Sequence, residues 1–415
     1  MALPPRVPRR EAGHVRPHAR FRGRTGAMRK HSIDLLLGGI TLLTPITLHL
    51  TFPVIPVIKA ELGLSDALAQ LTFSIVVLTL AFATLAYGAL GDRYGRRPVL
   101  LAGLALFLTG SILSALATSL AGLLTGRVIQ AAGAACGVTL ARAIARDVYG
   151  AEGMVKAIAY LTMAFAVGGL TAPGIGGLLV DHAGWRAVFG LASAAGIAAL
   201  VCTYLLVPET RAPVAAGAGT PMVAGLLELM RRPRFCALVI QTGCTTATFM
   251  ALATAASVLM KEALHRPATE FGLYFAMLPA GYITGTLIAS RLGNRVPVQR
   301  MVALGAGVSL AAVIAQSSLL LSGHLTPLVL FLPGALLTFG QGLALPFAQA
   351  GAMSVIPRLA ATAAGVGLFM QNFMGAGVAQ IYGLLADGTP MPLVQTTAVM
   401  AALCFVSALL ARPKT

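Results

Sequence analysis

The sequence predicts an all-α membrane protein with twelve transmembrane helices, arranged as two pseudo-symmetric six-helix bundles around a central cavity. Of its 415 residues, 57% are hydrophobic and only 10% are charged, whereas ordinary soluble domains carry about 25% charged residues. Apolar runs of about 20 residues recur along the chain, which is the length a helix needs to cross a hydrocarbon core of about 30 Å. Runs of that length exclude the short buried strands of a parallel sheet.

Twelve apolar runs are long enough to be spanning helices. They cover residues 33–57, 67–89, 99–118, 120–145, 156–180, 185–207, 235–260, 271–290, 301–321, 325–350, 361–386 and 390–410. An even number of spans places both termini on the same side of the membrane.

The distribution of cations selects that side. Of the 30 Lys and Arg, only Lys59, Arg186, Lys261 and Arg266 fall in the links of the opposite side, and Arg127 lies within a span. Because Lys and Arg concentrate in cytoplasmic links, both termini are expected in the cytoplasm. The expected location is the plasma membrane, as a multi-pass protein of a bacterial inner membrane.

A linker divides the chain into two halves. Residues 208–234 hold a stretch rich in Pro, Gly and Ala, which is typical of a connector. We therefore expect a basic cytoplasmic tail at 1–32, one six-helix bundle at 33–207 and a second at 235–411. The two halves share features such as a glycine-rich fifth span in each, and duplicated helical halves with a cleft between them are typical of alternating-access transporters.

The N-terminal tail and the cysteines add little chemistry. The tail is expected to be either disordered or the result of an upstream start, with Met28 as the natural first residue. The net charge of +17 would suggest a nucleic-acid partner in a soluble protein, but here the cations lie in short links and the tail. None of the five cysteines forms a CxxC pair, so neither a metal site nor a disulfide is expected.

A cationic turn joins the second and third spans and reads GALGDRYGRRPVL over residues 88–100. It resembles the signature loop of the major facilitator superfamily, Gly-x-Leu-x-Asp-Arg-x-Gly-Arg-Arg-x-x-Leu, at every specified position. The resemblance implies a cytoplasmic gate, in which we expect Asp147 to meet Arg93 or Arg96 and Asp92 to face a helix N-terminus of the other half. The gate candidates are Gly88, Asp92, Arg93, Gly95, Arg96, Arg97 and Asp147.

Arg127 lies well inside the fourth span, where an unpaired cation is costly, so it should face a wet or polar interior. The alternative is that it snorkels to the outer interface. The surrounding sequence resembles the fourth-span motif of the superfamily, whose arginine is tied to proton transfer and substrate binding. Gln130, one helical turn on, is expected on the same face, within reach of the cleft.

Residues 168–177 read GGLTAPGIGG and resemble the fifth-span motif of antiporters, with Ala172 where the motif usually has glycine. Proline kinks a helix and glycines permit close packing. The residues of this kink are Gly169, Pro173, Gly176 and Gly177. The alternative is that these residues form only a packing seam between helices. That alternative is compatible with antiport, because a tightly packed seam can prevent leakage through the protein to the outside.

The end of the first span resembles the bicyclomycin-resistance (Bcr/CflA) subfamily of drug/proton antiporters, but His49 stands where that subfamily has an aspartate. A histidine becomes charged when it binds a proton and can titrate near physiological pH. Our hypothesis is that His49 is the proton-sensitive group. The alternative is a neutral core histidine, hydrogen-bonded to a hydroxyl such as that of Thr44 or Thr47.

Polar and aromatic residues inside the second-half spans are candidates for a substrate pocket. They are Gln241, Thr245, Phe249, Tyr274, Gln341, Phe347, Gln371 and Asn372. Since no Asp or Glu lies deep in any span, neutral or weakly anionic substrates are expected over cationic ones.

Together these features predict a secondary transporter that exports small amphipathic compounds or drugs by proton antiport. The sequence has no Walker loop, so ATP is not expected to drive transport directly. The expected driving force is the proton gradient, and no cofactor is expected. No catalytic constellation is present, so an enzyme is not expected. The expected partners are a small-molecule substrate, protons and the lipid bilayer, with no nucleic acid, and the chain is expected to be a monomer. The alternatives are a facilitator, a dedicated metabolite transporter with altered coupling, or a membrane sensor.

Overall fold

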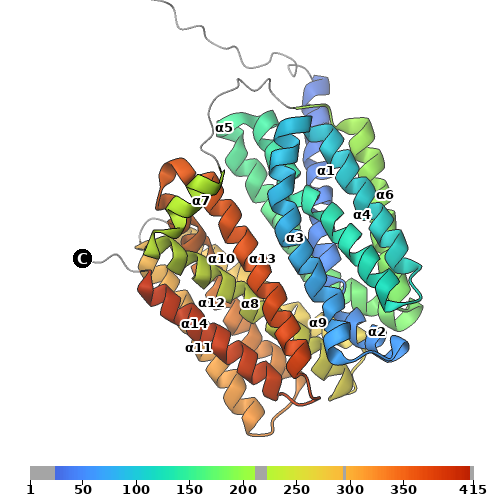
Figure 1. The fold of residues 1–415 in the computed structure, drawn as a ribbon, viewed down its shortest axis with the longest axis vertical. Helices are drawn as coiled ribbons and strands as arrows, with labels where there is room; N and C mark the ends of the chain where they lie inside the picture. The colour runs from blue at the N-terminus through green and yellow to red at the C-terminus, as the bar shows by residue number, and fades with distance from the viewer. Residues whose placement is uncertain (1–23, 211–221, 293–295, 412–415) are drawn as a thin grey trace, which may run out of the picture.

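The computed structural model describes residues 24–210, 222–292 and 296–411 as an all-helical chain (Figure 1). The expectations for residues 1–23 and for most of the connector therefore lie outside the described residues. Within the described ranges some side chains are also not described, and that of Asp92 is one of them.

The helices fall into two sets along the chain. The first contains α1 (Arg24–His49), the 3-10 turn η1 (Phe52–Val54), α2 (Ile55–Leu62), α3 (Asp66–Tyr94), α4 (Arg96–Ala115), α5 (Leu120–Ala183) and α6 (Trp185–Leu206). The second contains α7 (Met222–Met230), α8 (Pro233–Glu262), α9 (Ala268–Phe275), α10 (Met277–Leu292), α11 (Val298–Leu321), α12 (Pro327–Ser354), η3 (Pro357–Leu359), α13 (Ala360–Leu385) and α14 (Met391–Leu410).

The predicted multi-pass membrane fold is confirmed. Among the described residues, eleven segments are helical, long and apolar enough to cross a membrane. The remaining predicted span, 361–386, corresponds to α13, which is 26 residues long. Its three amide side chains, Gln371, Asn372 and Gln380, lower its mean hydropathy below that of the other spans.

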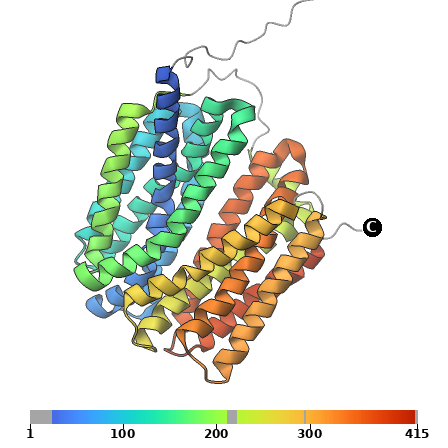
Figure 2. The same ribbon diagram turned by 180° about the vertical axis from the view of Figure 1, so that it is seen from behind.

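Two spans predicted as separate helices belong to one helical segment. The sequence predicts spans at 120–145 and 156–180, but α5 is helical from Leu120 to Ala183. It turns back on itself at one end of the molecule and so forms two arms (Figure 2). As a result α1 packs between its two arms. Thr44 Oγ1 donates to the Ala134 carbonyl at 3.1 Å on one arm, and His49 Nδ1 lies 3.4 Å from the Gly169 carbonyl on the other.

Two other predicted spans are interrupted. The first ends as a helix at His49 and continues through η1 into α2, with Pro53 in η1 and Pro56 in the first turn of α2. Proline removes a backbone donor and disfavours an uninterrupted helix. The predicted span 271–290 likewise consists of α9 and α10, which are separated at Ala276 shortly before Pro279.

The helices pack into two groups, α1 to α6 and α8 to α14, which meet mainly where α3 contacts α13 and where α5 contacts α9. We call the end of the molecule that holds the start of α1, Glu209 and α7 the terminal face, and the opposite end the distal face. Figures 1 and 2 show that the ribbons of the two groups converge toward the distal face and diverge toward the terminal face.

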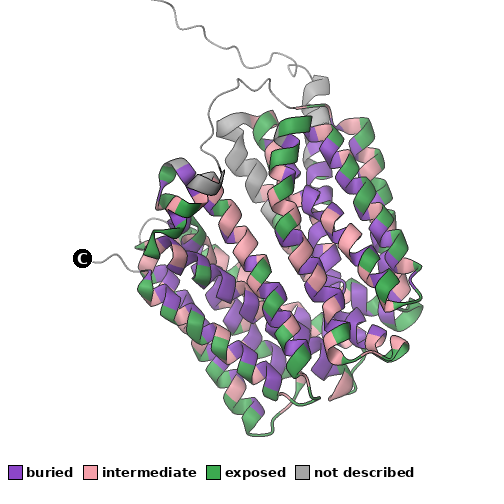
Figure 3. Ribbon diagram, viewed as in Figure 1, coloured by how far each residue is buried: buried purple, intermediate pink, exposed green. Residues whose placement is uncertain are grey.

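Burial follows the packing within each group. Buried residues lie where helices of one group face each other, and exposed ones along the outward faces (Figure 3). Many outward residues are large and apolar, including Leu205, Leu384 and Leu410, which are 67–70% exposed. Soluble proteins rarely expose so many apolar residues together, so these faces suit contact with lipid.

Glycines allow the two groups to touch through their backbones at the α5–α9 contact. A Cβ added to Gly272 of α9 would lie 2.5 Å from Gly174 Cα and 2.6 Å from the Pro173 carbonyl oxygen of α5. Neither backbone atom can move without shifting its helix. A side chain at position 272 is therefore incompatible with this contact.

We predict that Gly272→Ala forces α5 and α9 apart and lowers the free energy of unfolding by about 1–3 kcal/mol, the usual cost of overpacking. Thermal unfolding of the purified protein in detergent measures the effect. Gly377→Ala is the matched control, because a Cβ there meets nothing within 4 Å. Equal melting temperatures for the two variants would contradict the predicted close contact.

Candidate transport site

Arg127 is buried inside the N-terminal group, where each of its three side-chain nitrogens donates at least one hydrogen bond. Its side chain donates to Gln130 Oε1 at 2.5 Å, to the Thr47 carbonyl at 3.1 Å, to Thr51 Oγ1 at 2.9 Å and to the Thr72 carbonyl at 3.3 Å. Only 1% of the residue is exposed. The snorkelling alternative is therefore wrong, and Arg127 faces an interior lined by backbone, hydroxyl and amide oxygens.

These bonds tie Arg127 to the interruption of the first span. The Thr47 carbonyl belongs to the last turn of α1, where helix carbonyls lack helical partners and a nearby cation is favourable. The Thr72 carbonyl belongs to α3, and Gln130 Nε2 donates to Ser111 Oγ of α4 at 2.9 Å. Arg127 and Gln130 thus join α1, α3 and α4 to the first arm of α5.

Gln130 lies on the same face as Arg127, one helical turn away, as expected. Its amide bonds Arg127 and Ser111, both within the N-terminal group, rather than a residue across the cleft between the halves. The physical reason is that a buried guanidinium takes up whichever acceptors lie near it, and the Gln130 side chain is one turn away on the same helix.

His49 lies at the contact between the two groups. It is the last residue of α1 and 9% exposed. Its ring centroid is 5.7 Å from that of Phe52, 6.2 Å from that of Phe249 and 6.1 Å from that of Phe275. Phe249 belongs to α8 and Phe275 to α9, so His49 is enclosed by aromatic rings from both groups.

The hydroxyl partners proposed for a purely structural histidine are engaged elsewhere. Thr44 Oγ1 donates to the Ala134 carbonyl, and Thr47 Oγ1 donates to the Leu43 carbonyl. The polar neighbour that His49 does have is the Gly169 carbonyl, and no carboxylate among the described residues contacts the ring. An imidazolium in this position would lack a counter-charge.

The predicted fifth-span motif packs against the first span and α9. A Cβ on Gly169 would lie 3.2 Å from His49 Nδ1, and one on Gly176 would lie 2.8 Å from the Leu50 carbonyl. Gly177 lies against Ala268 of α9, and Pro173 is inside α5. The motif is thus a packing seam, and it supports both His49 and the contact between the groups.

Polar contacts on the distal face were not anticipated from the sequence. Lys59 of α2 pairs with Asp66 at 2.7 Å and with Glu262 of α8 at 2.9 Å. Asp181, near the end of α5, accepts from the backbone amide and the hydroxyl of Thr269 in α9, both at 2.7 Å. We call these five residues the distal latch, since two of its contacts join the N-terminal group to the C-terminal group.

A line of amide and hydroxyl side chains extends this contact along α3. Gln70 Nε2 donates to Thr254 Oγ1 of α8 at 3.4 Å, and Ser74 Oγ donates to Gln380 Oε1 of α13 at 2.5 Å. Gln380 Nε2 donates in turn to the Ala67 carbonyl at 3.1 Å. The only sequence signal for these residues was their polarity within apolar spans.

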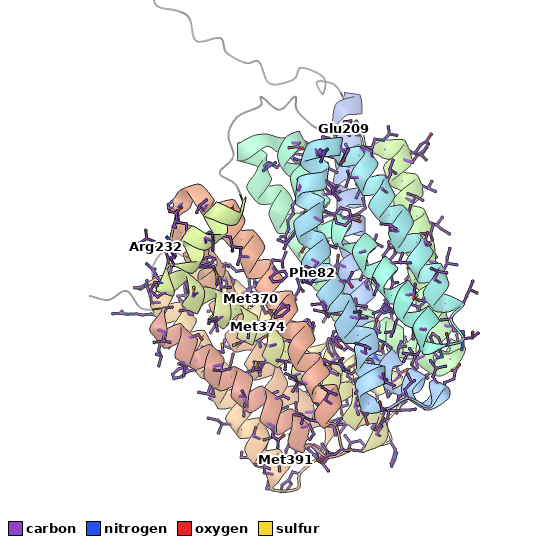
Figure 4. All side chains as sticks on the ribbon, viewed as in Figure 1. Phe82, Glu209, Arg232, Met370, Met374 and Met391 are labelled. Atoms are coloured by element: carbon purple, nitrogen blue, oxygen red, sulfur yellow. The ribbon has the colours of Figure 1, made fainter. Side chains whose placement is uncertain are left out.

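On the terminal face, the expected contact of Asp147 is confirmed with Arg96, whose Nε lies 3.2 Å from Asp147 Oδ2. Glu209, which directly follows α6, accepts from the backbone amides of Arg96 at 2.9 Å and Arg97 at 3.1 Å (Figure 4). Its carboxylate therefore caps the N-terminus of α4. Sequence reasoning missed this role, and the contact expected of Asp92 lies outside the described side chains.

The other gate candidates shape the turn. Gly95 has φ of 102°, a conformation that favours glycine. The Arg93 guanidinium packs over the Tyr94 ring at 5.1 Å from its centroid. Arg97 donates to the Tyr204 carbonyl at 2.8 Å, and a Cβ on Gly88 would meet open space. These residues fix the turn against α6.

The second-half candidates do not line one pocket in this conformation. Gln241, Thr245 and Gln341 form a cluster inside the C-terminal group, in which Gln241 Nε2 donates to Thr245 Oγ1 at 3.1 Å and Gln341 Nε2 to the Thr245 carbonyl at 2.9 Å. Phe249 alone of these candidates meets His49. Tyr274 stacks on Phe331 at 5.8 Å.

The remaining candidates are scattered. Asn372 donates to the Leu368 carbonyl of its own helix, and Phe347 packs against the apolar core near the terminal face. Gln371 is buried, and its Nε2 has no hydrogen-bond partner among the described residues. Gln241 Oε1 likewise has no hydrogen-bond partner among the described residues. These two amides thus keep hydrogen-bonding capacity that no described residue uses.

Comparisons with known proteins agree with this architecture. The profile of the family described as Major Facilitator Superfamily matches residues 37–379. The chain is 30% identical over 359 residues to "Multidrug resistance protein D" of Escherichia coli, covering 84% of this chain and 88% of that protein. It is 25% identical over 280 residues to the "Bicyclomycin resistance protein homolog" of Haemophilus influenzae, covering 66% and 69%.

Solved structures show the same fold. A bacterial homolog of the human lysosomal transporter Spinster, in an inward-facing conformation, superposes with a TM-score of 0.74 at 19% identity, covering 92% of this chain and 96% of that one. A D-xylose–proton symporter gives a TM-score of 0.71 at 14% identity, covering 92% and 97%.

We predict that Arg127→Lys destabilises the protein by about 3 kcal/mol, because one ammonium cannot replace the guanidinium fork and each lost charged hydrogen bond costs about 1.5–3 kcal/mol. The melting temperature in detergent reports the change. Arg146→Lys is the matched control on the same helix, since that side chain is 57% exposed. Equal melting temperatures for the two variants would show that the buried network contributes little.

Proposed function

Because the chain belongs to the Major Facilitator Superfamily, a family of secondary transporters, we propose that it exports small amphipathic compounds, drugs included, in exchange for protons. The names of its relatives, which concern multidrug and bicyclomycin resistance, support this substrate class. The excess of cations on the terminal face supports placing that face in the cytoplasm.

The position of His49 is the observation that carries the proposal. It is the one histidine among the described residues that is enclosed by rings of both groups. Any movement that separates α1 from α8 and α9 exposes it to water. A titratable group at such a contact couples proton binding to the relative position of the two halves.

In the proposed cycle, the conformation described here takes up substrate from the cytoplasm. The halves then separate at the distal face, substrate leaves, and a hydrated His49 binds a proton from outside. When the rings close around His49 again, the charged imidazole has no counter-ion and loses its hydration. The proton is then released toward the cytoplasm, which completes the exchange.

The substrate preference follows from the same chemistry. Neither His49 nor the unpartnered amides Gln241 and Gln371 supply a negative charge. Amides hydrogen-bond neutral donors and acceptors, so we propose neutral or weakly anionic amphipathic compounds as substrates. Cationic drugs would meet Arg127 nearby without a carboxylate to balance it.

The second candidate function is a facilitator, or a dedicated metabolite transporter, with altered coupling. It is favoured by one observation, the histidine in place of the aspartate of the subfamily that the first span resembles. In that case substrate exchange would proceed equally well with and without a proton gradient. Counterflow measurements in proteoliposomes separate the two candidates.

We predict that a pH gradient no longer accelerates transport by His49→Ala, so that its gradient-driven rate falls about tenfold or more below that of the wild type. Substrate counterflow should remain intact. His49→Asp should restore the acceleration, since a carboxylate also binds and releases a proton. The measurement is uptake of neutral and cationic drugs into proteoliposomes after a pH jump.

His182→Ala is the matched control, because His182 is an exposed histidine that lies 2.9 Å from a carbonyl of its own helix. Gradient-driven uptake at the wild-type rate by His49→Ala would refute the proposed role. Absence of uptake of every compound by the wild-type protein would refute the proposed drug substrates.

A further inference from the structure

The corner between α7 and α8 combines exposed apolar and basic side chains on the terminal face. Leu227 and Met230 of α7 are 57% and 50% exposed, although α7 is anchored on its other side by the fully buried Leu229. Arg231 and Arg232 follow at once and are exposed. Figure 4 shows Arg232 at the edge of the C-terminal group that faces away from the N-terminal group.

The arginines of this corner have no neutralising partner among the described residues. Arg231, Arg232 and Arg234 form no ion pair or side-chain hydrogen bond with a described residue, and Arg234 Nε is buried without a partner. The acid in the preceding turn, Glu228, already interacts with another residue. Three cations within four positions thus keep their capacity to bind an anion.

The apolar residues limit what that anion can be. A soluble anion would use the arginines and leave Leu227 and Met230 exposed to water. A short helix with an apolar exposed side next to arginines is the arrangement that binds membrane surfaces, with its apolar side chains at the acyl boundary. Clusters of Lys and Arg beside a spanning helix attract anionic headgroups.

We propose that the α7–α8 corner binds an anionic phospholipid of the leaflet at the terminal face. The headgroup phosphate accepts hydrogen bonds from Arg231, Arg232 and Arg234, and an acyl chain covers Leu227 and Met230. Arginine suits this role because its guanidinium binds phosphate through two parallel hydrogen bonds. The bound lipid anchors the connector between the two groups at its C-terminal end.

Native mass spectrometry of the detergent-purified protein, titrated with phosphatidylglycerol or phosphatidylcholine, tests the proposal. Arg231→Gln/Arg232→Gln should weaken phosphatidylglycerol binding about 25-fold, because each lost arginine contact weakens it about fivefold. Phosphatidylcholine binding should be unchanged. Leu227→Ser/Met230→Ser should weaken binding of both lipids at this site. The readout needs no transport, so it can fail or succeed independently of the proposed antiport.

Arg291→Gln/Arg300→Gln is the matched control, because both side chains are exposed and lie in the same group, at the end of α10 and the start of α11. It should leave phosphatidylglycerol binding within about twofold of wild type, a change worth far less than one arginine contact. An equal loss in this control would show attraction to surface charge in general and overturn the proposal. So would unchanged binding by Arg231→Gln/Arg232→Gln, or complete displacement of the lipid by glycerol phosphate at equal concentration.

Discussion

A guanidinium buried in a membrane-spanning bundle must have its donors satisfied, and much of this structure follows from how Arg127 meets that requirement. Its partners are the last-turn carbonyl of α1, a hydroxyl in the interruption that follows, and a carbonyl of α3. These bonds anchor the interruption of the first span after His49, where Pro53 already disfavours a continuous helix. The interruption in turn places the imidazole against rings of the opposite group.

The contact between the two groups is built from parts that can separate. Glycine backbones touch at α5–α9, amides and hydroxyls pair along α3, and ions pair in the distal latch. Partly exposed ion pairs are worth less than about 1 kcal/mol each, so none of them alone commits the protein to one conformation. A contact of many weak parts suits a transporter, because substrate and proton binding supply only a few kcal/mol to shift it.

Composition and run length were sufficient to predict the spanning helices, since lipid demands about 20 apolar residues regardless of the partners of a helix. The contact of Asp147 with Arg96 was also predictable, because the predicted spans place the turn after the second span and the end of the fourth span on the same side. Two features could not be predicted: the partners of Arg127, and the pairing of Lys59 with Glu262, which lies 203 residues away in the chain. They depend on which faces two distant spans turn toward each other, and a single sequence carries no signal for that. Polar residues such as Gln241 and Gln371 could be recognised as buried, but not assigned to one pocket.

The central claim is that the two groups part at the distal face in every transport cycle. Cysteines in place of Asp181 and Thr269, whose side chains touch at 2.7 Å, can be joined by a short bis-methanethiosulfonate cross-linker, which forms a reducible disulfide with each thiol. The native cysteines, five in all, are replaced in this variant. The measurement is substrate uptake into proteoliposomes before cross-linking, after it, and after reduction. The account predicts that uptake stops on cross-linking and returns on reduction. Uptake at an undiminished rate through the cross-linked protein would contradict it.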